Sequence, residues 1–168
     1  YDFYQPEAYV ASSDMFIEKE AVVNREIDRL RHEATCNLLT RRDVVVVASV
    51  SCIYGLGNPE MFLRQMLTFK VGEEYGPGAV ARMLVDRGYE RNDIDLDRGR
   101  FRVRGDVMDI HPAHTERLIR IEWFGDEIER IREIDALSTE VVAELTECKL
   151  FPANHYNAED EAVEKAVK

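Results

Sequence analysis

The clearest pattern of hydrophobic and polar positions begins at Arg25, where apolar residues recur every three or four positions. These residues are Ile27, Leu30, Ala34 and Leu38. They share one side of a helix, and Asn24 stands immediately before it, where an N-cap is expected. The sequence therefore predicts an amphipathic helix that ends near Thr40.

The next stretch, DVVVVASVS over residues 43–51, is a continuous apolar run rich in β-branched side chains. Such a run is typical of a buried strand in a parallel sheet. A glycine-containing loop follows, with Asn58 as N-cap and Pro59 at the first helical position, which predicts a helix from about Pro59 to Met66. Strand, glycine loop and helix in this order indicate an α/β segment.

Shorter elements begin at Leu67. Residues 67–75 predict a strand, and residues 76–89 predict a short helix that opens after glycine and stops at Gly88. Three stretches of alternating character follow, over residues 95–112, 117–135 and 141–153. Turn glycines separate their halves, so they predict an antiparallel sheet.

The second of these stretches contains isoleucines at every third residue, which fits neither a regular strand nor a helix. They are Ile128, Ile131 and Ile134. We predict a strand with a bulge at this point.

These changes of pattern predict an α/β plus α+β fold in several parts. Residues 25–66 form the α/β segment, and residues 67–153 an inserted α+β domain built on the antiparallel sheet. Residues 154–168 return to the α/β segment with a helix from Asn157, and residues 1–24 form a separate aromatic stretch. Because no methionine opens the chain, we expect an excerpt from a longer polypeptide.

The composition is that of a globular protein, with 45% hydrophobic residues among 168, and the net charge is −11. Bulk electrostatics therefore repels nucleic acid and anionic lipid, so any DNA contact must be local. Cys36, Cys52 and Cys148 form no C-x-x-C pair and have no histidines at zinc-like spacing, which favours a reduced, cytoplasmic setting without a metal site. No apolar run approaches the roughly 20 residues that span a bilayer.

The opening stretch, YDFYQPEAYV, is rich in aromatic rings but too polar for a core strand. With Phe16 it suits a two-stranded ribbon that turns in residues 12–14. The rings are Tyr1, Phe3, Tyr4, Tyr9 and Phe16. Two interpretations stay open: a hairpin packed on its own domain, which is the commoner use of such rings, or a platform on which bases stack, each contributing about 1–3 kcal/mol.

Arginines occupy alternate positions in RGRFRVR, residues 98–104, so in a strand they share one face and leave Phe101 and Val103 on the other. Arg120 and Glu122 likewise share a face of their predicted strand. The core side of that strand carries Ile119, Ile121 and Trp123. The polar face is either a solvated surface with weak cross-strand ion pairs or a docking surface, because arginine is enriched at interface hot spots.

The loop around Gly55 and Gly57 precedes a helix N-terminus, which suits phosphate, but it lacks the lysine and hydroxyl of a P-loop. No Ser-His-Asp, Cys-His or metal-binding constellation can be assembled. The sequence therefore assigns no catalytic residue, no metal ligand and no cofactor to this chain.

Eight stretches, in this order and at these intervals, closely resemble one known family. They are YDFYQPEAYV, IEKE, EIDRLRHEAT, RRDVVVVASVSCIYGLG, YERNDID, FRVRGDV, IRIEWFGDEIERIREID and LFPANHY. The family is UvrB, the damage-verifying subunit of bacterial nucleotide excision repair. The resemblance covers essentially the whole chain, and SVSCIYGLG and FRVRGD are its most specific parts.

The resemblance implies that residues 1–24 form a β-hairpin that slides between the two DNA strands and tests for a damaged nucleotide. Tyr1, Tyr4 and Tyr9 match tyrosines of the family, with Tyr4 nearest the lesion. Phe3 and Phe16 stand where tyrosine is expected, so stacking is kept but a hydroxyl hydrogen bond is lost. Residues 25–66 and 154–168 are similar to parts of the family's helicase core.

The resemblance also implies that residues 67–153 are the UvrA-interacting domain. Its partner-binding surface matches Arg91, Arg102, Arg104, Arg120 and Glu122. The family's ATP site lies upstream of Tyr1 and its other motor motifs downstream of Lys168. We therefore expect ATP and Mg²⁺ only in the intact protein. We expect UvrA and damaged DNA as partners of this chain, and UvrC as a partner of the intact protein.

Two other hypotheses stay open. The first is that the chain is a protein-docking module alone, similar to the UvrA-binding module of the transcription-repair coupling factor. In that case its hairpin does not contact DNA in this form. Alternatively it is an enzyme that uses the Gly55 to Gly57 loop, which predicts nucleotide affinity without any added domain.

Overall fold

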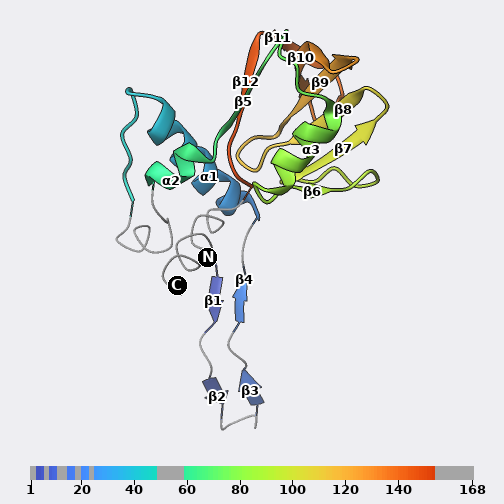
Figure 1. The fold of residues 1–168 in the computed structure, drawn as a ribbon. Helices are drawn as coiled ribbons and strands as arrows, with labels where there is room; N and C mark the ends of the chain where they lie inside the picture. The colour runs from blue at the N-terminus through green and yellow to red at the C-terminus, as the bar shows by residue number, and fades with distance from the viewer. Residues whose placement is uncertain are drawn as a thin grey trace, which may run out of the picture.

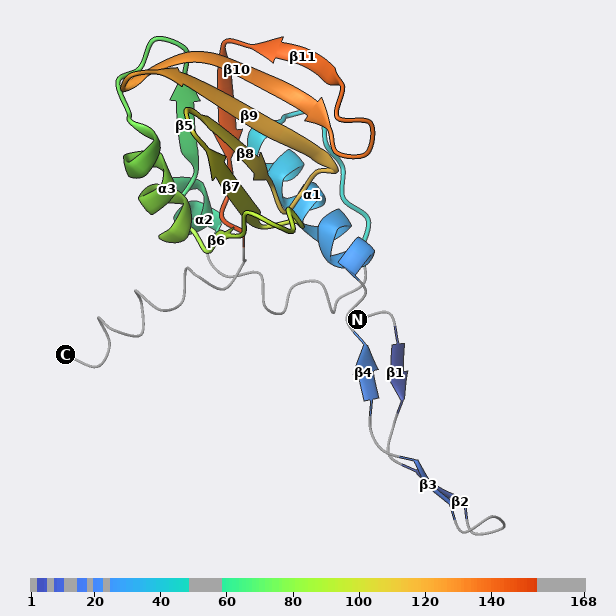
Figure 2. The same cartoon turned by 90° about the vertical axis from the view of Figure 1, so that its right-hand side faces the viewer.

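The structure, a computed structural model, describes residues 25–48 and 59–153 and four short strands before them. These strands are β1 (Phe3–Gln5), β2 (Ala8–Val10), β3 (Met15–Ile17) and β4 (Glu20–Val22). β1 pairs with β4 and β2 with β3, both antiparallel, in a ribbon that extends away from the rest of the molecule (Figures 1 and 2). The pairings confirm the predicted two-stranded ribbon, whose predicted turn at residues 12–14 lies outside the described residues.

Two helices follow, α1 (Arg25–Thr40) and α2 (Pro59–Arg64). α1 begins and ends where the apolar periodicity predicts, and α2 begins at the predicted proline and ends two residues early. Cys36 of α1 packs in a small cluster with Phe62 of α2 and with Phe151, and the two phenylalanine rings stack with centroids 5.6 Å apart. Both helices are therefore attached to the segment that ends the described chain.

The predicted buried strand after α1 is wrong where the structure describes it. Residues 44–48 form no strand, and Val45 and Val47 are 89% and 95% exposed. A buried parallel strand forms only when other strands pair with it on both sides, and no described strand pairs with this run. The described residues therefore form an α+β fold, and the predicted α/β segment is not seen in them. The Gly55 to Gly57 loop and the helix from Asn157 lie outside the described part of the chain.

A six-stranded sheet forms the centre of the described structure. Its strands are β6 (Glu90–Arg91), β7 (Arg100–Arg104), β8 (Val107–His111), β9 (Arg117–Phe124), β10 (Glu127–Asp135) and β11 (Val141–Leu145). They lie in the order β11-β10-β9-β8-β7-β6, and only the β6–β7 pair is parallel. The antiparallel sheet that the alternating stretches predict is confirmed except at its end, because β12 (Glu147–Leu150), in the second half of the third stretch, pairs with β5 (Leu67–Lys70) in a separate sheet.

One face of this sheet packs against α3 (Pro77–Val85) and against the antiparallel pair of β5 (Leu67–Lys70) and β12 (Glu147–Leu150) (Figure 2). The buried side chains of this core include Phe69, Val80, Leu84, Phe101, Met108, Ile110, Ile121, Ile128 and Ile131. Removal of this much apolar surface from water is the main favourable term in folding. The opposite face of the sheet carries mainly charged side chains, together with Leu118 and Ile134, which are register partners on β9 and β10 and are buried.

Two tight turns set the register of the strands that carry these polar side chains. Gly105 and Gly125 have φ of 61° and 65° and open the two-residue turns of the β7–β8 and β9–β10 hairpins, a conformation that glycine adopts without strain. In β10 the register then shifts between Ile128 and Arg130, which confirms the predicted bulge. Because Glu129 is the extra residue, Ile128 and Ile131 both face the core while Arg130 faces outward.

Candidate functional site

The outward side of the sheet carries a row of charged side chains across four neighbouring strands, which we call the arginine face. It consists of Arg100, Arg102, Arg104, Asp109, Arg120, Glu122, Arg130 and Arg132. These residues share one face because register partners in antiparallel strands point to the same side of a sheet. The other side of the same strands holds the apolar core, so the predicted separation of the two faces is confirmed.

The centre of the arginine face is a single carboxylate between two arginines. Asp109 is the register partner of Arg102 on β7 and of Arg120 on β9. Nη2 of Arg102 lies 2.8 Å from Oδ2, while Nε and Nη2 of Arg120 donate to Oδ1 and Oδ2 at 2.6 and 3.1 Å. Burial of Asp109 raises its pKa, but the hydrogen bonds from Arg120 and Arg102 outweigh burial, so that its pKa lies below the ordinary value.

A second carboxylate lies one row away, between arginines of β10. Glu122 accepts a hydrogen bond from Nη2 of Arg132, and its other oxygen lies 3.8 Å from Nη1 of Arg130. Arg132 stands directly opposite Arg120, a pairing of like charges that is unfavourable unless each has an acid of its own. Among the described residues the Nε of Arg132 is buried without a hydrogen-bond partner. The three central arginines thus share two carboxylates.

The rim of the arginine face lies at the β6 edge of the sheet. Arg91 of β6 pairs with Asp93 at 3.1 Å, and the same carboxylate accepts the backbone N–H of Val103 at 3.1 Å. Hydrogen bonds from Arg91 and from Val103 lower the pKa of Asp93. The exposed Arg104 only reaches the backbone carbonyl of Asp93, at 3.5 Å, whereas Arg100 forms ion pairs with two acids of this edge.

The structure places four residues of the predicted partner-binding set on the arginine face: Arg102, Arg104, Arg120 and Glu122. The fifth, Arg91, is the register partner of the buried Phe101, so by register it belongs to the other side of the sheet, at its edge. Arg102, Arg120 and Glu122 lie centrally, Arg104 lies at the end of β7 and Arg91 lies on the edge strand. Most of these arginines contact acids of their own chain, yet the side chains of Arg102 and Arg120 remain 21% and 28% exposed. A guanidinium has five N–H donors, so each of these two has donors left for a partner.

Sequence reasoning missed three members of the face: Asp109, Arg130 and Arg132. The signal for Asp109 was present, because a two-residue turn at Gly105 and Asp106 sets Arg102 opposite Asp109 by counting alone. The two arginines of β10 had no such signal, since their side of the strand depends on which residue forms the bulge.

The aromatic residues of the opening stretch form a separate candidate site. Tyr9 and Phe16 are register partners in the β2–β3 pair, while Phe3 and Tyr4 belong to β1. Tyr1 lies outside the described residues. The ribbon points away from the sheet, so its strands lie apart from those that carry the arginine face (Figures 1 and 2).

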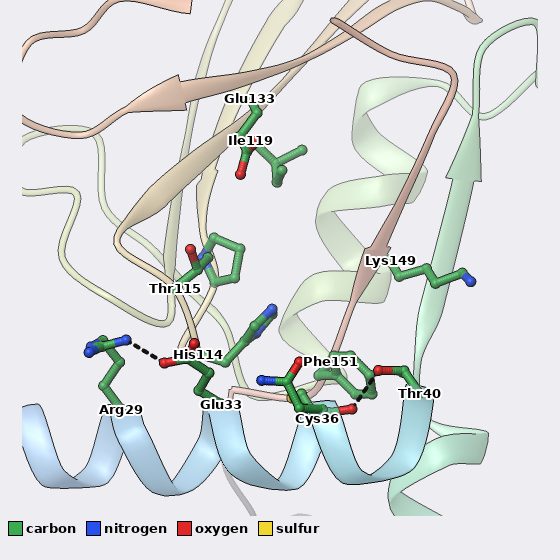
Figure 3. A pocket seen from close by; sticks show the side chains of 12 residues that line it. Arg29, Glu33, Cys36, Thr40, His114, Thr115, Ile119, Glu133, Lys149 and Phe151 are labelled. Carbon is green, nitrogen blue, oxygen red and sulfur yellow. Dashed lines mark hydrogen bonds and ion pairs between the residues drawn. The ribbon is translucent and has the colours of Figure 1, made fainter. Parts of the chain in front are cut away.

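A polar cavity of about 300 Å³ lies between α1 and the sheet domain (Figure 3). Cys36 on α1 and His114 from the loop before β9 both line it. Their protonation states do not suit a nucleophile and its general base. Burial raises the pKa of Cys36 to about 12 and lowers the pKa of His114, so the thiol stays protonated and the imidazole neutral at pH 7. The described residues hold no cluster of three side chains suited to a metal ion and no helix able to cross a membrane.

Comparison with known proteins gives two findings. A sequence model described as the UvrB interaction domain matches residues 67–156. UvrABC system protein B of Enterococcus faecalis is 55% identical over 99% of the chain, and its counterparts in Geobacillus kaustophilus and Carboxydothermus hydrogenoformans are 55% and 52% identical over 100% of it. The chain covers 25% to 26% of these proteins, so it spans about a quarter of the length of the curated relatives it matches.

Proposed function

The chain belongs to the UvrB family, and from this premise we propose that it is the UvrA-binding and damage-probing part of a nucleotide excision repair protein. One observation carries the proposal. The segment that matches the UvrB interaction domain is the segment whose sheet presents the arginine face. We propose residues 67–153 as the docking domain, residues 1–24 as the DNA-probing hairpin, and residues 25–66 and 154–168 as parts of a helicase core.

Docking on the arginine face is proposed to rest on charge-assisted hydrogen bonds from guanidinium groups to acidic side chains of UvrA. Such bonds are about twice as strong as neutral ones, and arginine makes them in a fixed fork geometry. Arg104 and Arg91 are exposed at the rim and Arg102 and Arg120 are half-buried at the centre. This arrangement of a half-buried centre and an exposed rim suits a partner that must dissociate again during repair.

The test is a charge reversal in the full-length protein that contains this chain. Arg102→Glu combined with Arg104→Glu is expected to weaken UvrA binding about 30-fold or more in isothermal titration calorimetry, the loss typical of an interface hot spot. Arg82→Glu is the matched control, because Arg82 is exposed on α3, on the far side of the core from the arginine face. Equal UvrA affinity for the double variant and the control would refute the assignment.

The aromatic ribbon is proposed to contact DNA by stacking, because a chain with a net charge of −11 gains little from phosphate attraction. Tyr4 is the ring proposed to lie nearest the lesion. Tyr4→Ala is expected to lower affinity for a lesion-bearing duplex by about 5-fold to 150-fold, which corresponds to the loss of about 1–3 kcal/mol of stacking. Tyr4→Phe keeps the ring and is the control; fluorescence anisotropy at low salt measures both.

The second candidate function is protein docking alone. The acidic net charge favours it, since it opposes DNA binding everywhere outside the ribbon. In the same anisotropy titration, docking alone predicts no lesion binding, or binding that Tyr4→Ala leaves unchanged.

Catalysis is not assigned to this chain. The sequence contains no G-x-x-x-x-G-K-[ST] motif, so ATP and Mg²⁺ are proposed to bind elsewhere in the intact protein, with UvrC as a further partner and the cytoplasm as its location. Nucleotide calorimetry on the 168-residue chain is therefore expected to show no heat of binding. A clear binding isotherm would return the Gly55 to Gly57 loop to consideration as a nucleotide site.

A further inference from the structure

We propose that Asp109 is a positioning residue, which holds Arg102 and Arg120 in one fixed arrangement so that UvrA meets a prepared pair of guanidinium groups. The inference rests on the proposed function, since it concerns how the same face recognises UvrA. Asp109 itself does not contact the partner, because its side chain is only 5% exposed.

The geometry that supports this role is a carboxylate bridging three strands. Asp109 lies at the middle of β8, directly between its register partners on β7 and β9. One oxygen accepts from Nε of Arg120 at 2.6 Å, and the other accepts from Nε of Arg102 at 2.9 Å. Both carboxylate oxygens therefore accept hydrogen bonds, and each arginine contacts Asp109 through its Nε and Nη2.

The benefit of this arrangement is preorganisation. An arginine side chain has many rotamers in water, and ordering it at the moment of binding weakens association. Here the order is already present in the unbound chain, because a short aspartate on a central strand leaves the two guanidinium groups little freedom. The remaining N–H donors of Arg102 and Arg120 are free to bind carboxylates of the partner.

The opposite possibility is that Asp109 competes with UvrA for the same guanidinium groups. Displacement would leave a buried carboxylate with fewer hydrogen bonds, which is strongly unfavourable. A partner that adds hydrogen bonds without removing Asp109 avoids this penalty. The burial of Asp109 therefore favours positioning over competition, and the two roles predict opposite effects of neutralising it.

The test is Asp109→Asn in the full-length protein, with UvrA affinity measured by calorimetry. Positioning predicts binding about tenfold weaker. Asp109→Glu, which restores a carboxylate, is expected to recover affinity to within about threefold of the original. Asp43→Asn is the matched control, since Asp43 is 70% exposed and pairs with Arg41, which lies outside the arginine face; it is expected to leave affinity within about twofold.

Two outcomes overturn the proposal. The first is that Asp109→Asn binds UvrA as tightly as the original protein or more tightly. The second is that Asp109→Glu unfolds at a normal temperature but does not recover UvrA affinity. If Asp109→Asn does not fold, Arg120→Lys takes its place, because lysine keeps the charge but cannot fork onto Asp109. Positioning then predicts a loss of UvrA affinity equal to that of Arg120→Ala, and full affinity of Arg120→Lys overturns it.

These results separate the inference from the proposed function. If Arg102→Glu with Arg104→Glu leaves UvrA binding intact, the docking assignment itself fails. If that double variant loses binding while Asp109→Asn keeps it, docking stands and only the positioning role is lost.

Discussion

Deletion of Glu129 tests how one bulge assigns the side chains of β10 to the two faces of the sheet. Glu129 is exposed and has no register partner, whereas Arg130 is already opposite Glu122. Without Glu129 the β9–β10 hairpin becomes regular and every later residue keeps its present partner. We expect the variant to keep both the core and the arginine face.

The magnitude follows from what the deletion changes. No core side chain moves to another face, so the free energy of unfolding should fall by less than about 1.5 kcal/mol, the scale of one hydrogen bond. Deletion of Arg132 differs, because every later residue of β10 then changes face. Ile134, now 1% exposed, loses its site, at a cost of about 1.5–3 kcal/mol, and Asp135 is forced toward a new environment.

Deletion of Arg130 is the matched control for deletion of Glu129. It also removes the bulge and keeps the register of Ile131, but it leaves Glu129 opposite Glu122 in place of an arginine. The two deletions should differ in the free energy of unfolding by about 0.5–1 kcal/mol, the scale of an exposed cross-strand charge pair. Their comparison isolates the charge from the change in backbone.

Denaturation in guanidinium chloride, followed by tryptophan fluorescence, measures all three variants. Trp123 is the single tryptophan of the sequence, is 4% exposed, and donates from Nε1 to the carbonyl of Tyr75 at 2.6 Å, so it reports on the core next to the hairpin. If deletion of Glu129 destabilises the protein as much as deletion of Arg132, the assignment of Glu129 as the extra residue is wrong.

Three further predictions concern single side chains. Phe101→Ala should lower the free energy of unfolding by about 3–5 kcal/mol in urea, because Phe101 is fully buried in the core. The pKa of Asp109 is lowered in the folded chain, so its stabilising effect is complete above the ordinary aspartate pKa of about 3.9. The effect is lost as pH falls through the lower folded-state pKa. The free energies of unfolding of wild type and Asp109→Asn, measured in urea, should therefore converge below about pH 4. Cys36 and Cys148, whose pKa values burial raises to about 12, should react with a thiol reagent at pH 8 about 100-fold more slowly in the native chain than in denaturant, measured in a Cys52→Ser background.

The elements that sequence alone predicted well are those whose signals are local. α1, α3 and the tight hairpins depend on periodicity, capping and turn glycines, and these lie within a few residues of one another. The apolar run at residues 44–48 was predicted wrongly because a buried strand depends on partners elsewhere, which no pattern within the run can supply.

The arginine face was predicted in part for the same reason. Alternation placed Arg102 and Arg104 on one side of β7, and Arg120 and Glu122 on one side of β9. Which acids they contact depends on the pairing of strands, and this pairing brings Asp109 between Arg102 and Arg120. The internal ion pairs therefore could not be read from alternation alone.

These internal ion pairs also bear on how strongly the proposed interface binds. A face of unpaired guanidinium groups would repel itself, and a face of apolar residues would aggregate when the partner is absent. With Asp109 and Glu122 shared among three arginines, the face is stable without a partner and still has N–H donors to offer. Few contacts within the face need to break on docking, so the free-energy cost of binding is small. The acids already present screen part of the arginine charge, so the favourable binding free energy from these arginines is limited as well. The result expected from this balance is specific but reversible docking, set by the fit of UvrA carboxylates to arginines whose positions the strand register has already fixed.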